Sequence, residues 1–131
     1  MDSSISYCDI NFQGIDRKFL LRQLIGTGYS KIAENLLNNL ENINVIFDDG
    51  TPTILEAVKA NDKDMVSLML SKGMNPDLED NNSISPLLQS ILNYNLEMEE
   101  LLSRYGATFT EECNETFNEV NNSIYKILPE L

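Results

Sequence analysis

The stretch TILEAVKANDKDMVSLMLSKG, residues 53–73, holds two groups of apolar residues separated by a short polar break, and it ends on a glycine. Thirty-three residues further on, PLLQSILNYNLEMEELLSRYG, residues 86–106, repeats the pattern without a gap. The two copies match in their apolar positions and in their final glycines, Gly73 and Gly106. The same step backward reaches KFLLRQLIGTGYSKIAENLLNNL, residues 18–40, where the apolar positions match again. The chain therefore contains three copies of one 33-residue unit.

Each copy is predicted to form two short amphipathic helices. Within each group the apolar residues lie three or four positions apart over about ten residues, as on one face of an α-helix. TP at residues 51–52 and SP at residues 85–86 offer a hydroxyl for exposed amides and a proline suited to a first helical turn. The breaks contain Gly28 or Asn61, which enter a left-handed turn at low cost. Each copy is therefore a helical hairpin.

The segments between the hairpins, ENINVIFDDG (41–50) and MNPDLEDNNSIS (74–85), are rich in Asn and Asp and predict turns or extended fingers. A 33-residue period of helix, turn, helix and finger is the period of ankyrin repeats. The chain resembles that family through DGTPTILEAVKANDKDMVSLMLSKGMNPDLED (49–80) and SPLLQSILNYNLEMEELLSRYGA (85–107). The resemblance covers residues 16 to about 107, some seventy per cent of the chain.

Several positions depart from the pattern of the family. Leu55 and Leu88 replace the histidine that opens the first helix, and its loss removes a hydrogen bond that ties neighbouring fingers. Tyr94 stands where a turn glycine is usual, and the TP of the second copy comes one residue early. The sequence therefore predicts a divergent array with lower local stability than a consensus one, because each repeat contacts only its neighbours.

The tail TFTEECNETFNEVNNSIYKILPEL, residues 108–131, has apolar residues at steps of three and four. Thr108 and Glu111 have the spacing of a capping box, and Pro129 ends the pattern. A stack of repeats leaves an apolar face open at its end, so this segment is predicted to be a long capping helix. The alternative is that its apolar stripe docks on a partner.

These elements predict one all-α domain, an ankyrin-repeat solenoid of helical hairpins with a C-terminal capping helix. It consists of an N-terminal segment (1–15), three repeats (16–48, 49–81 and 82–107) and the capping helix (108–131). No run approaches the roughly eighteen apolar residues of a membrane span, and the first residues lack the pattern of a signal peptide. We therefore expect a cytoplasmic protein.

The charge of the chain is strongly acidic, with nine basic and 21 acidic residues and a net charge of −12. The excess begins at Glu34, since from there on eighteen acidic residues face five basic ones. Binding to nucleic acid or to an anionic membrane gains its affinity from Lys and Arg, so both are disfavoured. A basic protein partner is favoured, unless the acidic residues serve only solubility.

Little in the sequence points to catalysis. Histidine is absent, which removes the commonest general base and zinc ligand. IGTGYSK (25–31) lacks phosphate-loop spacing, and DLEDNN (77–82) lacks the glycine and glutamate of a calcium loop. Glu99 and Glu100 are adjacent on a helix and are expected to face solvent in different directions. We expect no enzyme activity, metal or cofactor, and free thiols at Cys8 and Cys113.

The family resemblance implies a binding platform made of finger tips and the exposed side of the first helices. Carried onto this sequence, that surface comprises Ile46, Asp48, Asp49, Thr51, Glu56, Lys59 and Ala60 in the second copy, and Glu79, Asp80, Asn81, Asn82, Ile84 and Asn93 in the third. Such an acidic groove suits a basic protein, in a contact of about 800 Å² a side.

Our leading hypothesis is that the chain is a small, monomeric inhibitor or immunity protein. It would neutralise a basic toxin enzyme, for example a nuclease, by direct binding. One alternative is a viral or bacterial ankyrin effector that binds a host protein. Another is a nucleic-acid mimic, whose carboxylates would have to be regularly spaced in a surface stripe.

Overall fold

The computed structural model describes residues 16–127, with side chains to residue 123. The predicted N-terminal segment with Cys8, and residues 128–131 of the predicted cap, lie outside the described residues. The described part is all-helical, with seven α-helices and no strand. The helices are α1 (Arg17–Leu24), α2 (Ser30–Asn38), α3 (Thr53–Lys59), α4 (Lys63–Ser71), α5 (Pro86–Leu92), α6 (Leu96–Arg104) and α7 (Glu111–Ile127).

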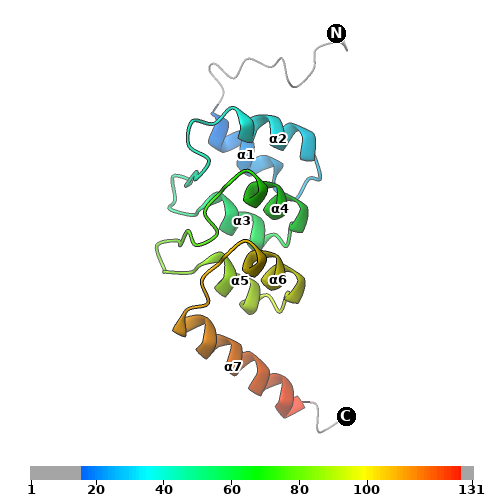
Figure 1. Cartoon of the computed structure of the whole chain (residues 1–131), viewed down its shortest axis with the longest axis vertical. Helices are drawn as coiled ribbons and strands as arrows, with labels where there is room; N and C mark the ends of the chain where they lie inside the picture. Colours follow the sequence, from blue (N-terminus) through cyan, green and yellow to red (C-terminus); the bar gives the residue numbers. More distant parts are fainter. Residues whose placement is uncertain (1–15, 128–131) are drawn as a thin grey trace.

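The first six helices form three helical hairpins that lie one above another (Figure 1). Helix α2 packs against α4, α3 against α5, and α5 against α7. The loops that join successive hairpins project to one side of the stack, and α7 lies below the third hairpin (Figure 1). The chain thus adds one hairpin after another along a single axis.

The hairpins share one continuous apolar core. Its largest fully buried side chains are Leu21, Leu36, Ile54, Leu55, Met69, Leu87, Ile91, Met98 and Leu102. They come from the positions that recur at 33-residue intervals in the sequence, so equivalent residues of neighbouring hairpins stack on one another. Burial of such side chains contributes roughly 1.5–3 kcal/mol each, which makes this core the main stabilising feature of the stack.

The start signals of α3 and α5 differ, although both contain a hydroxyl residue and a proline. Ser85 accepts a hydrogen bond from the amide of Leu88, and Pro86 is the first helical residue of α5, as predicted. In α3, by contrast, Pro52 itself occupies the N-cap position and no side chain caps the helix. The predicted capping role of Thr51 is therefore wrong, because the TP pair comes one residue too early for it.

The N-cap of α7 lies two residues later than predicted, at Thr110 instead of Thr108. The amide of Cys113 donates to Thr110 Oγ1 at 3.2 Å, so Thr110 caps the helix. Thr108 instead donates from its amide and from its hydroxyl to the two carboxylate oxygens of Asp77, both at 2.8 Å. The predicted capping box of Thr108 and Glu111 is wrong, since Thr108 is held by the preceding finger.

The inner face of α7 covers the third hairpin. Cys113 is a free, buried thiol on that face, and Phe117 and Val120 pack against the core. Phe117 also meets Phe109 edge to face, with ring centroids 6.4 Å apart. Among the described residues, no helix is long and apolar enough to cross a membrane.

Asparagine and aspartate side chains tie neighbouring hairpins together. Asp62 Oδ2 accepts from the amide of Gly26 at 2.7 Å, which joins the turns of the first and second hairpins. Asn44 Oδ1 accepts from the amide of Asn75 at 2.7 Å, and Asn93 Nδ2 donates to the carbonyl of Val58 at 3.2 Å. These bonds span 31 to 36 residues, close to one repeat, so each of them links one hairpin to the next.

Candidate protein-binding surface

The tips of the two inter-hairpin loops form an exposed polar surface, here called the finger surface. It consists of Ile46, Asp48, Asp49, Glu79, Asn81 and Asn82, all of them exposed. The first finger closes on itself through an isolated bridge between Ile46 and Pro52. Asn81 Nδ2 reaches the carbonyl of Asp49 at 3.4 Å, which joins the two tips.

Arg22 of α1 forms ion pairs with two of the acidic residues that were predicted to bind a partner. Its Nη2 atom lies 2.9 Å from Asp49 Oδ2 and 2.8 Å from Glu56 Oε1, and its guanidinium lies 4.6 Å from the ring centroid of Phe47. The Thr51 amide, and after it Arg22, lower the pKa of Asp49 to about 2. Asp49 and Glu56 therefore hold the first hairpin to the second, a role that sequence reasoning missed.

A shallow hollow of about 370 Å³ separates α1 from α3 beside this ion-pair cluster. Arg22, Ile25, Glu56, Lys59 and Ala60 line it. Lys59 is exposed, as predicted for a binding residue, but the charges around the hollow are balanced rather than acidic. Asp48, at the tip of the first finger, also has a cation nearby, since Lys18 Nζ lies 3.9 Å from its carboxylate.

Four predicted residues have structural roles in addition to, or instead of, a place on the surface. Thr51 is buried, and Ile84 is half-buried against the core. Asp80 accepts from the amides of Asn82 and Ile84, which fixes the second finger tip. Asn93 is tied to the second hairpin through the carbonyl of Val58. The structure therefore does not place these side chains together as one exposed acidic patch.

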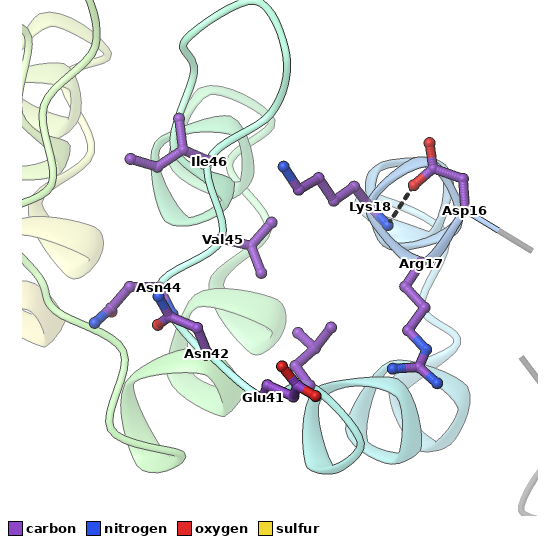
Figure 2. A pocket seen from close by; sticks show the side chains of 9 residues that line it. Asp16, Arg17, Lys18, Glu41, Asn42, Asn44, Val45 and Ile46 are labelled. Atoms are coloured by element: carbon purple, nitrogen blue, oxygen red, sulfur yellow. Dashed lines mark hydrogen bonds between the residues drawn. The ribbon is translucent and has the colours of Figure 1, made fainter.

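An open groove of about 600 Å³ lies between the start of α1 and the first finger. Figure 2 shows Lys18 extending from α1 toward the strand-like segment that carries Val45 and Ile46. Arg17 of the same helix donates from Nη1 to the carbonyl of Asn39 at 3.3 Å. Basic and acidic residues both line the groove, so it has no preference for one charge.

A smaller cleft of about 150 Å³, the C-terminal cleft, lies where the α5–α6 turn meets α7. It is lined by Ile91, Tyr94, Leu96, Glu99, Phe117, Val120 and Asn121. Burial, and to a lesser degree the negative charge of Glu100, raises the pKa of the Glu99 carboxyl. The expectation that Glu99 and Glu100 form a purely solvated pair is wrong for Glu99, because α7 covers one side of it.

Tyr94, in the lining of this cleft, has an unusual backbone conformation. Its φ is 57°, in the left-handed region where glycine is usual, yet its side chain is 64% exposed. In the sequence, the signal for this site is a tyrosine at the turn position where the first two hairpins have Gly28 and Asn61. Phe117 and Val120, which line the cleft with it, come from a helix more than twenty residues away in the chain.

The charges are distributed unevenly along the stack. Residues 16–63 contain seven acidic and six basic side chains, whereas residues 64–123 contain eleven and two. Seven of these carboxylates belong to α6 and α7, and among the described residues only Glu97 forms an ion pair, 3.3 Å from Lys63 Nζ. The acidic excess of the sequence is therefore concentrated at the C-terminal end.

The described residues contain no group of His, Cys, Asp or Glu side chains arranged to hold a metal ion. The IGTGYSK segment comprises the turn between α1 and α2 and the first two residues of α2, and DLEDNN lies on the second finger. No family model matches the chain, and comparison with curated proteins found no match.

Proposed function

We propose that the chain is a divergent ankyrin-like array whose function is to bind another protein. Three stacked hairpins with fingers on one side support this reading (Figure 1), because that arrangement presents a broad and preorganised surface. The repeat length of 33 residues and the terminal helix α7 agree with a capped solenoid of this kind.

The observation that carries the proposal is the ordering of the two finger tips. Asp49 accepts from the amide of Thr51, Asp80 accepts from those of Asn82 and Ile84, and Asn81 joins the tips. These three side chains are thus held in place by hydrogen bonds within the fold. A surface fixed in this way loses little conformational entropy when a partner binds.

The partner that we propose is a protein with a basic surface. The eleven acidic and two basic residues between positions 64 and 123 favour this charge, since complementary potentials accelerate association and exclude wrong partners. An enzyme that acts on nucleic acid has such a surface at its own substrate site. Neutralisation of a toxin nuclease by direct binding is therefore the function that we propose. Capture of a host protein by an effector is the competing possibility.

Affinity capture from the source cells, with two proteins as bait, tests the proposal. One bait is the native chain, and the other carries Asp48→Lys and Glu79→Lys at the finger tips, where both side chains are exposed. A basic protein retained only by the native chain, whose enzymatic activity falls on binding, supports the proposal. Capture of nothing, or of the same proteins by both baits, contradicts binding through the finger surface.

A further inference from the structure

The C-terminal cleft combines an apolar interior with an exposed apolar rim. Ile91 forms part of its floor and is 1% exposed, while Phe117 and Val120 of α7 are half-buried. Tyr94 and Leu96 on the rim are 64% and 66% exposed, the two largest such fractions among the large apolar side chains of the described residues. Two such side chains at one opening are unlike scattered surface hydrophobics and indicate a contact surface.

The size of the cleft fits one large apolar side chain. Its volume is about 150 Å³, and an apolar protein cavity of about this size holds a benzene ring. A leucine or phenylalanine side chain would therefore fill it. The cleft is too small to enclose a drug-sized ligand, whose pockets measure about 300–1,000 Å³.

The charge beside the cleft selects the kind of partner. Glu99 lines the cleft, and its carboxylate forms no ion pair or hydrogen bond with another described residue. Glu100 follows it on α6 and acts on it electrostatically, whereas Glu97 is paired with Lys63. A cation placed here would meet the unpaired carboxylate of Glu99 and the negative charge of Glu100, whereas an acidic segment would be repelled.

Tyr94 supplies an independent indication that the rim has a function. A left-handed backbone costs a non-glycine residue about 1–2 kcal/mol, and burial does not account for a tyrosine here, since Tyr94 is 64% exposed. Strain of this kind is often retained at binding sites. Asn61, at the equivalent turn of the second hairpin, has a φ of 56° but is a residue that tolerates it.

We propose that the C-terminal cleft binds a basic amphipathic helix of a partner protein, with one apolar side chain in the cleft and a Lys or Arg beside Glu99. This inference rests on the proposed protein-binding function and adds a second contact site to it. The finger precedes α5 and the α5–α6 turn follows it, so the cleft and the second finger lie at opposite ends of that helix. One partner could reach both sites, and the two can be tested separately.

The probe is a synthetic helical peptide of roughly four turns, or about 14 residues, with leucine on one face and lysine on the other. Calorimetric titration against the native chain should give saturable binding. A peptide with glutamate in place of every lysine, and another with alanine in place of every leucine, should bind at least ten times more weakly, a difference of about 1.4 kcal/mol.

Matched variants place the binding in the cleft. Leu96→Ser should weaken the peptide about tenfold, whereas Phe19→Ser, which changes a similarly exposed apolar residue at the other end of the stack, should not. Glu99→Gln should weaken it more than Glu100→Gln, although both remove one negative charge from α6. Tyr94→Gly should weaken binding while leaving the fold at least as stable, since it relieves the left-handed strain, so its loss of binding cannot result from unfolding.

Several results would overturn the proposal. They are no binding of the leucine–lysine peptide, equal binding of its glutamate counterpart, or equal loss with Phe19→Ser and Leu96→Ser. Binding that arises only after deletion of residues 128–131 would do the same, because the end of the chain would then be the occupant. Since the finger-tip bait variant leaves the cleft unchanged, failure here and failure of partner capture remain separate results.

Discussion

Arg22 in the first hairpin and Glu99 in the third illustrate how differently the two ends of the stack use charge. Arg22 lies within 3 Å of both Asp49 and Glu56, so the predicted acidic residues around it are neutralised inside the molecule. Glu99 lies partly under α7, with Glu100 as its charged neighbour and no ion-pair partner among the described residues. The difference teaches that an acidic sequence does not place its acidity evenly, because a single arginine from a neighbouring repeat can give a structural role to a carboxylate that was predicted to bind a partner.

The feature that the two ends share is the apolar core, and its disruption should have the largest effect. Ile91→Ala removes a side chain that is 1% exposed between α5 and α7, and we expect it to destabilise the fold by about 2–5 kcal/mol. Leu21→Ala in the first hairpin, also fully buried, should cost a similar amount. Urea unfolding followed by circular dichroism measures both.

Leu92→Ala is the matched control for Ile91→Ala, since it changes the next residue of α5, which is 45% exposed. Its cost should stay below about 1 kcal/mol. If Ile91→Ala were as mild as Leu92→Ala, α7 would not depend on the third hairpin for its place. The core would then end at α6, and the cleft would have no fixed wall.

Removal of the arginine should affect stability next most strongly. Arg22→Met retains much of the aliphatic stem over Phe47 but removes the contacts to Asp49 and Glu56, and it leaves the half-buried Glu56 without its cation. We expect a loss of roughly 1–3 kcal/mol in the free energy of unfolding. Lys59→Met, at an exposed lysine of the same hollow, should change it by less than about 0.5 kcal/mol. Equal effects of the two would mean that Arg22 is only a surface charge.

Much of the helical architecture follows from local signals that need no partner. The apolar spacing gives the hairpins, and the glycines that end α4 and α6 have left-handed φ angles of 92° and 90°. Ser85 caps α5 as its sequence context predicts. These features depend on residues within one turn of each other, so periodicity and turn chemistry are enough to find them.

The candidate binding surface was harder to predict because its side chains meet across repeats. Arg22 contacts residues 27 and 34 positions away, and Thr108 bonds to Asp77, 31 positions away. Alternative partners exist for each of these groups, and the sequence alone cannot choose among them. Leucine instead of histidine at the start of α3 and α5 predicted few hydrogen bonds between repeats. Asp62, Asn44 and Asn93 provide such bonds at other positions.

Loss of the contact between the two finger tips should lower the free energy of unfolding by less than loss of the Arg22 ion pairs. Gly50 has a φ of 88°, and a Cβ atom there would collide with the side chain of Asn81, which donates to the carbonyl of Asp49. Gly73 has a similar φ of 92° but open space around it. Gly50→Ala should therefore destabilise the fold by about 1 kcal/mol more than Gly73→Ala, the value of one hydrogen bond. Equal losses in thermal unfolding would show that the finger tips are not coupled.

The pH dependence of stability should separate the two ends by sign, although each effect is small. The pKa of Asp49 is lowered from 3.8 to about 2, so the folded state favours its charged form. Its stabilising contribution is present above about pH 4 and is lost as the pH falls toward 2. The pKa of Glu99 is raised above 4.5, so its contribution is present below pH 4.5 and is lost as the pH rises through the folded value.

At pH 7, Asp49→Asn should therefore destabilise the protein, whereas Glu99→Gln should leave it equal or more stable, with Glu100→Gln as the control for net charge. Unfolding series between pH 2 and 7, with carboxyl titrations by NMR, measure both residues. The same sign for both variants at pH 7 would mean that the two carboxylates have equivalent surroundings, and the contrast between an internally paired end and an open acidic end would not hold.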